Sequence, residues 1–124
     1  MQTEEIDTII KDRAALESSE AAHEAGTTVL AELSRLNIGS EAREMAAQLP
    51  AEYKEALASH EGSEDLSRDA LLGRIESALD LDRDATTRVA NATISVIADA
   101  VTPGERTSFV NALPQDISGL AVWS

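Results

Sequence analysis

The apolar residues of this chain recur at helical spacing. Near the start, Ile6, Ile9, Ile10 and Ala14 are spaced so that they share one face of a short helix. A longer apolar face follows, formed by Ala22, Ala25, Val29, Leu33 and Leu36. No segment alternates apolar and polar residues over the length of a strand. The pattern therefore predicts an all-α fold.

Residues that favour helix ends divide the first half of the chain into four expected helices. A hydroxyl of the Ser18–Ser19 pair can cap the second helix. Gly39 predicts the end of that helix, because glycine readily adopts the left-handed conformation. Ser40 can then cap a third, short helix that runs to about Gln48, and Pro50 can start a fourth.

The second half of the chain carries the same kinds of signal. We expect a helix from about Ser67 to Leu79, followed by a long helix that Asp82 can cap. The segment Thr102–Glu105 reads as a capping box with proline at the first helical position, and Pro114 can open the last helix. The polar segment of about residues 60–65, which contains a glycine, is the expected linker between the halves.

The two halves also share a sequence motif. Residues 47–52 read AQLPAE, and residues 111–116, which lie 64 positions later, read NALPQD. Apolar positions upstream match at the same spacing, which becomes 65 before about residue 17. We therefore predict two tandem copies of a roughly four-helix unit, at about residues 4–59 and 66–122. The copies are expected to pack as one helical bundle in a single domain, residues 1–124.

Composition predicts a thin core with few large side chains. Apolar residues make up 43% of the chain but aromatic residues only 2%. The single tryptophan, Trp123, lies next to the chain end. Two interpretations of this residue remain open. It packs the last helix onto the core, which would order the terminus, or it is an exposed anchor for a partner.

The chain is strongly acidic, with 23 acidic and 10 basic residues and a net charge of −13. One interpretation is a salt-adapted host, because molar salt screens the repulsion between carboxylates. Folding only in molar KCl would support this interpretation, and full folding in dilute buffer would contradict it. The other is an acidic surface made for a basic partner. Direct binding to nucleic acid is disfavoured in either case, since phosphates require clustered lysine and arginine.

The chain lacks several features that would define other classes of protein. It has no cysteine, which excludes a disulfide, a thiolate metal site and a thiol nucleophile. No apolar run approaches the roughly 20 residues that span a bilayer. The first residues are acidic and do not have the form of a signal peptide. We therefore expect a soluble, cytoplasmic protein that does not contact a membrane.

Few residues offer catalytic or metal-binding chemistry. The histidines are His23 and His60, and neither accompanies a local signature of a serine nucleophile. Glu20 and His23 have the Glu-x-x-His spacing of di-iron helical proteins, but residues 84–87 of the second copy lack the matching histidine. We therefore predict no catalytic residue, no metal site and no cofactor. Glu20 and His23 are retained as a metal-ligand candidate, with a solvated helix face as the preferred interpretation.

The segment Glu41–Pro50, which reads EAREMAAQLP, resembles a known family. Together with the upstream VLAEL at Val29–Leu33 and the later NALP, it is similar to the bacterial and archaeal family of domains of unknown function numbered 2267 (DUF2267). The resemblance covers about Ile6 to Leu120. It implies an all-helical tandem fold and no established activity. It also implies no catalytic residue that could be carried over to this chain.

Three hypotheses about function follow from these observations. The preferred one is a non-enzymatic module that binds an unknown protein partner in a groove between the two copies. Its candidate surface residues are Leu49, Pro50, Leu113, Pro114 and Trp123. An alternative is a small-molecule-binding or enzymatic protein whose acid-rich pocket uses carboxylates such as Glu52, Glu55 and Asp116. A third is a homo-oligomeric stress or regulatory protein that associates through exposed apolar stripes.

Overall fold

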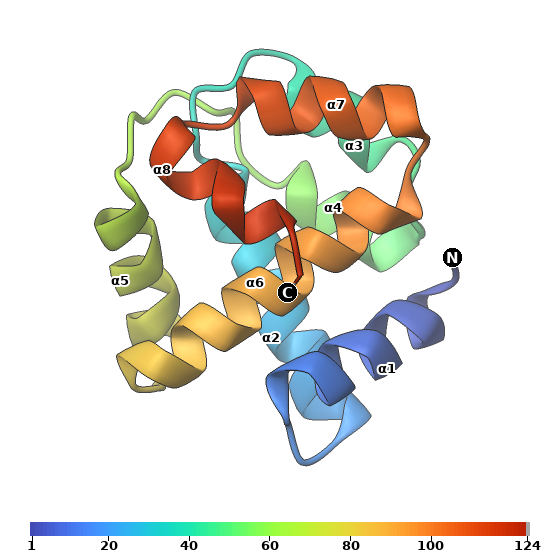
Figure 1. Cartoon of the computed structure of the whole chain (residues 1–124), viewed down its shortest axis with the longest axis vertical. Coiled ribbons are helices and arrows are strands. Elements are labelled where there is room, and N and C mark those ends of the chain that lie inside the picture. The colour runs from blue at the N-terminus through green and yellow to red at the C-terminus, as the bar shows by residue number, and fades with distance from the viewer. Residues whose placement is uncertain (124) are drawn as a thin grey trace.

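The computed structural model describes residues 1–123 and is built from helices (Figure 1). The prediction of an all-α fold is confirmed. In chain order the elements are α1 (Thr3–Ala14), α2 (Ser19–Leu33), α3 (Glu41–Ala46), α4 (Ala51–Leu57), α5 (Arg68–Leu79), α6 (Arg83–Ala100), α7 (Pro103–Ala112), α8 (Gln115–Ser118) and the short 3₁₀ helix η1 (Gly119–Ala121). None of these helices is long and apolar enough to cross a membrane.

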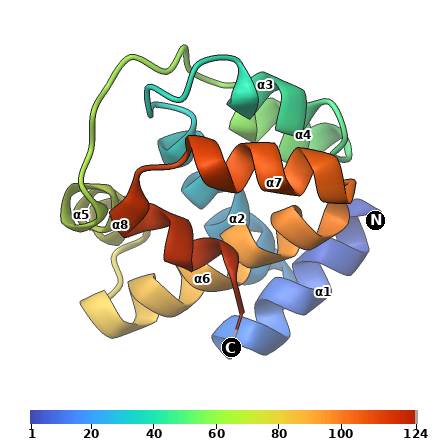
Figure 2. The ribbon, with the colours of Figure 1, turned by 45° about the horizontal axis from the view of Figure 1, so that its top comes forward.

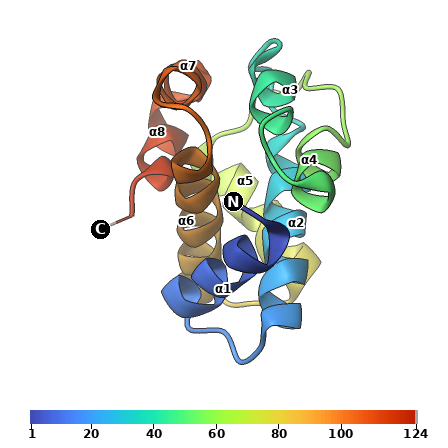
Figure 3. The same ribbon diagram turned by 90° about the vertical axis from the view of Figure 1, so that its right-hand side faces the viewer.

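The two long helices, α2 and α6, form the centre of the fold. They contact each other, and both α1 and α5 pack against the two of them. Figure 3 shows α2 and α6 side by side, with α1 lying across them. The outer helices extend this centre, because α4 packs on α2 and η1 packs on α6. The buried apolar side chains form one contiguous core that draws on both halves of the chain.

Most predicted helix starts are present with the expected hydrogen bonds. The side chains of Ser18, Ser67, Asp82 and Thr102 each accept a hydrogen bond from a backbone N–H in the first turn of their helix. Each bond satisfies an N–H group that has no partner inside the helix. The predicted cap at Ser40 is absent, because its hydroxyl accepts no backbone bond from α3 and donates to the carboxylate of Glu44.

The end of α2 differs from the prediction. The helix ends at Leu33, and Gly39, which has a left-handed φ of 66°, lies in the loop before α3. The chain leaves the helix because its backbone pairs with the linker: Asn37 N–H donates to the carbonyl of Glu64 at 2.9 Å. Leu36 stays buried and forms an isolated parallel bridge with Glu64. The apolar periodicity therefore continued past the end of the helix itself.

The linker can approach the segment after α2 this closely because residue 62 is glycine. A Cβ atom at Gly62 would lie 1.9 Å from the carbonyl oxygen of Leu36, inside the distance that any two such atoms tolerate. The N–H groups of Ser63 and Glu64 both donate to the carbonyl of Arg35. The predicted linker is therefore fastened to the chain that follows α2.

The division into two tandem copies remains a prediction. The predicted counterparts α3 and α7 lie side by side (Figure 2), and they pack against each other. Other counterparts differ in length: α4 has seven residues, whereas α8 has four and continues into η1. Two pairs of short helices thus occupy similar places in the chain order but are not built alike.

Candidate functional site

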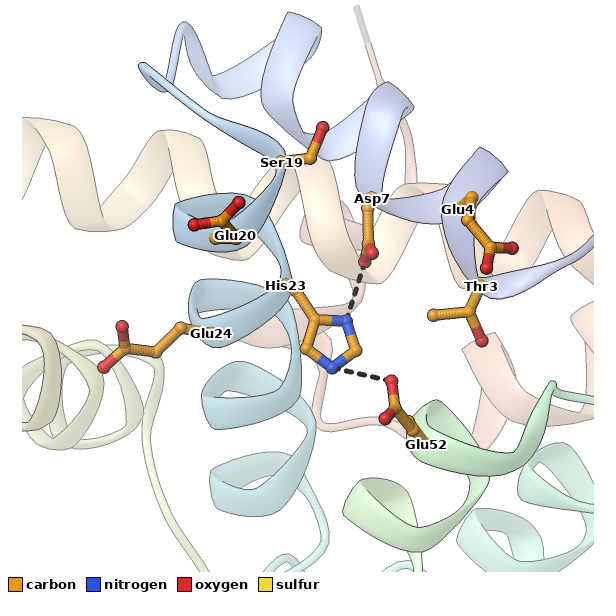
Figure 4. Close-up of a pocket in the computed structure, with 8 residues that line it drawn as sticks. All are labelled: Thr3, Glu4, Asp7, Ser19, Glu20, His23, Glu24 and Glu52. Carbon is orange, nitrogen blue, oxygen red and sulfur yellow. Dashed lines mark hydrogen bonds and ion pairs between the residues drawn. The ribbon is translucent and has the colours of Figure 1, made fainter.

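His23 projects from α2 between two carboxylates that belong to two other helices. Its Nδ1 lies 2.9 Å from Oδ1 of Asp7 on α1, and its Nε2 lies 2.9 Å from Oε2 of Glu52 on α4 (Figure 4). A neutral imidazole can donate from only one nitrogen, so both contacts are hydrogen bonds only when the ring is protonated. The protonated ring then links α1, α2 and α4.

Tyr53 contacts the Asp7 carboxylate that meets His23. Its side chain is fully buried, and its hydroxyl donates a hydrogen bond to Oδ1 of Asp7 at 2.5 Å. Burial, and secondarily the bond to Asp7, raises the pKa of Tyr53 well above its ordinary value. The tyrosine ring stands edge-on to His23 with the ring centroids 5.5 Å apart. Tyr53 therefore remains a hydrogen-bond donor that holds Asp7 in place.

An open hollow of about 370 Å³ lies over His23. Its walls carry five acidic side chains, together with Thr3, Ser19 and His23 itself; the acidic residues are Glu4, Asp7, Glu20, Glu24 and Glu52. Figure 4 shows the carboxylate of Glu20 pointing away from the imidazole. The two residues of the Glu-x-x-His pair thus line one hollow, but the carboxylates that meet His23 come from Asp7 and Glu52.

A second group of carboxylates lies where α3 meets α7. Glu41, Glu44 and Glu105 place one carboxylate oxygen each within 4.8 Å of the others, and within residues 1–123 no other set of three metal-ligating side chains comes so close. Burial, followed by the neighbouring Glu44 and Glu105, raises the pKa of Glu41. Glu41 and Glu105 are positions that the predicted repeat matches to each other. The like charges therefore meet because the two short helices pack together.

A third feature is a hollow beside the last described residues, which we call the C-terminal hollow. It is lined by Arg68 of α5, by Thr87, Arg88 and Asn91 of α6, and by Gly119, Leu120, Val122 and Trp123. The amide of Asn91 donates to the carbonyls of Leu120 at 3.0 Å and Val122 at 2.9 Å. These two bonds hold the segment after η1 against α6.

Trp123 and Val122 are exposed at the edge of the C-terminal hollow. Val122 is 65% exposed and Trp123 37%, and within residues 1–123 the other exposed large apolar side chain is Met1. The guanidinium carbon of Arg13 lies 5.3 Å from the centroid of the Trp123 ring. This cation–π contact restricts the indole without burying it.

The other residues singled out from the sequence lie in varied surroundings. Leu49 and Leu113 are only 5% exposed and belong to the core, while Pro50 and Pro114 are half-buried and directly precede α4 and α8. The Leu-Pro motifs therefore fill the core and begin helices, and leave little apolar surface free. Asp116 is exposed and accepts a hydrogen bond from the backbone N–H of Arg68 at 2.8 Å.

Sequence reasoning missed Asp7 and Tyr53 as neighbours of His23. The sequence marks Glu52 only as one carboxylate of an acid-rich pocket. Asp7 lies 16 positions before His23 in the chain and 46 positions before Tyr53. Residues so far apart give no local spacing signal, because the packing of α1 and α4 on α2 is what brings them together.

The comparison with known proteins concerns the family as a whole. No match to this chain was found among curated proteins. The family described as "Uncharacterized conserved protein (DUF2267)" matches residues 3–120, which is nearly the whole chain. That description names no reaction, ligand or partner. The resemblance read from the Leu-Pro motifs is confirmed, and the chain belongs to the DUF2267 family.

Proposed function

We propose that this protein is a non-enzymatic interaction module that binds a protein partner at its C-terminal hollow. The observation that carries the proposal is the exposure of Trp123 and Val122 beside that hollow. Tryptophan is among the residues that most often dominate the binding energy of protein interfaces. Large apolar side chains are otherwise buried through most of the fold, so this exposure stands out.

The segment that carries Trp123 is already ordered before any partner arrives. Asn91 holds its backbone through two hydrogen bonds, and Arg13 covers one part of the indole. A preordered side chain loses less conformational entropy on binding than a mobile one. The same contacts also argue against a role limited to filling the core, because they leave more than a third of Trp123 exposed.

The His23 hollow offers less support for an enzyme. A general base needs a free nitrogen that faces the proton it removes. Here both ring nitrogens face carboxylates, those of Asp7 and Glu52, and no hydroxyl within residues 1–123 donates to the imidazole. We interpret this cluster as a tie between helices α1, α2 and α4.

The proposal can be tested by capture from the lysate of the protein's own host, in the salt of that host. We expect a discrete partner that the Trp123→Ala variant binds at least about tenfold more weakly, since a buried tryptophan at an interface contributes about 2 kcal/mol or more. Lys54→Ala is the control, because Lys54 is also exposed but is not part of the hollow. Circular dichroism checks that both variants fold. Equal binding by wild type and the Trp123 variant would contradict the proposal.

A further inference from the structure

We infer that the partner presents an acidic segment whose carboxylates pair with Arg68 and Arg88 beside Trp123. This inference rests on the proposed function and names the chemistry of the partner. It starts from a comparison of the arginines. Within residues 1–123, six of the eight form an ion pair with a carboxylate of the same chain: Arg13, Arg35, Arg43, Arg74, Arg83 and Arg106.

The two arginines outside this set both line the C-terminal hollow. Arg68 and Arg88 form no ion pair with any residue in 1–123, although the chain has 23 acidic residues for 10 basic ones. The lysines, Lys11 and Lys54, also lack such a pair, but they lie on α1 and α4 and neither lines the C-terminal hollow. Within residues 1–123, two arginines without an ion pair therefore line the same hollow as the exposed Trp123.

The positions of these arginines are set by the fold. Arg68 is the first residue of α5, and its backbone N–H is bonded to the carboxylate of Asp116 at 2.8 Å. This bond engages one carboxylate oxygen of Asp116, the acidic residue of α8. Arg88 is exposed on α6, one turn before the Asn91 that holds the C-terminal segment. Arg68 and Arg88 thus line the hollow from two different helices, α5 and α6.

The chemistry of these side chains specifies the kind of ligand. A guanidinium group presents a planar fork of N–H donors that matches a carboxylate in a bidentate geometry. An indole offers a large apolar face beside it. A peptide that carries two carboxylates near an apolar side chain would use both arginines and Trp123 together.

Charge favours a protein segment over the other anionic partners. A nucleic acid would extend its phosphates beyond two arginines and over a surface whose net charge is −13. A second copy of the chain carries the same net charge and would be repelled unless salt screens it. A short acidic segment needs only the local charge of the hollow. An apolar side chain in that segment would also contact Val122 and Trp123, which a bare anion would not.

The test uses a phage-displayed library of random ten-residue peptides selected against the full-length protein. We expect the selected peptides to be enriched in aspartate and glutamate next to an apolar residue. A fluorescent copy of one of them then measures affinity by anisotropy. The Arg68→Glu/Arg88→Glu double variant should bind this peptide at least about tenfold more weakly than wild type.

The matched control is the Lys11→Glu/Lys54→Glu double variant, which changes the net charge by the same amount away from the hollow. Its affinity should stay within about twofold of wild type. An equal loss in both double variants would show an effect of overall charge and overturn the inference. Selection of non-acidic peptides, or of none, would also overturn it. Tighter binding to an oligothymidylate than to the peptide would overturn the inference. A dimer that depends on Arg68 and Arg88 and forms in place of peptide binding would overturn it too.

Failure of the inference and failure of the proposed function give different results. Neutral peptides that bind wild type but not Trp123→Ala would overturn the acidic partner and leave the docking surface intact. Acidic peptides that bind equally well to wild type and Trp123→Ala would contradict the proposed function.

Discussion

Replacing Tyr53 with phenylalanine removes one buried hydroxyl group and keeps the ring that fills the core. The hydroxyl donates to the carboxylate of Asp7, which in turn contacts His23. A hydrogen bond to a charged group contributes about 1.5–3 kcal/mol to stability. For a domain of this size, such a loss lowers the melting temperature by about 6–12 °C. We expect Tyr53→Phe to be destabilised by this amount at neutral pH.

The same substitution should also change how stability depends on alkaline pH. The pKa of Tyr53 is raised in the folded protein, mainly by burial and then by Asp7. Below the ordinary tyrosine pKa of about 10, both states keep the proton and the stabilisation is complete. Above it, the unfolded chain releases the proton while the folded protein retains it. The wild-type protein should then lose about 1.4 kcal/mol of stability per pH unit, a loss that the phenylalanine variant lacks.

Urea unfolding followed by far-ultraviolet circular dichroism, from pH 7 to pH 11, measures both effects. The difference in free energy of unfolding should be constant up to about pH 10 and should shrink above it. The lysines titrate in the same range in both proteins and cancel in the difference. Tyr53 is the only tyrosine, so phenolate absorbance reports its ionisation directly. A difference that stays constant throughout, or phenolate forming near pH 10 in the folded protein, would refute this reasoning.

Two further predictions concern Gly62 and Glu41. Gly62→Ala should cost about 1–3 kcal/mol in urea unfolding, because its Cβ would meet the backbone of Leu36; Gly104→Ala, where a Cβ meets nothing within 4 Å, is the control and should be neutral or stabilising. An equal cost at both glycines would contradict the steric argument. The pKa of Glu41 is raised in the folded protein, so folding favours the protonated carboxyl. The stability that this contributes is complete below the ordinary glutamate pKa and is lost as pH rises. The stability of Glu41→Gln relative to wild type, measured by urea unfolding, should therefore increase from pH 4 to pH 7 by about 0.2–0.5 kcal/mol. A flat or falling difference would contradict an unfavourable carboxylate at Glu41, disfavoured by burial and by Glu44 and Glu105.

The surface that we propose for a partner keeps Trp123 from the candidates read from the sequence and leaves out the Leu-Pro residues. The Leu-Pro motifs are the most recognisable part of the sequence, and the family matches residues 3–120, which contain both of them. Their leucines are buried, however, so these residues serve the core and the helix starts. The surface that we propose for a partner lies instead at the C-terminal hollow. A motif that defines a fold need not mark the site of binding.

The sequence by itself determined the helical class, most helix starts and the core faces. These features depend on interactions within a few residues, such as a serine or aspartate side chain that caps the next turn. The tandem relation of the halves was read from the same local patterns and remains a prediction. Residues such as Ser18 and Asp82 therefore took the roles that their neighbours in the chain predicted.

Only the tertiary structure decided where α2 ends and which polar side chains meet. Leu36 lies outside α2, where the neighbouring Arg35 and Asn37 form backbone hydrogen bonds with the distant linker. Asp7, His23 and Glu52 met because three separate helices pack together. Arg68, Arg88 and Trp123 came to one hollow in the same way. Such contacts join positions far apart in the chain, so no local spacing encodes them, and only the packing of the core brings them within reach.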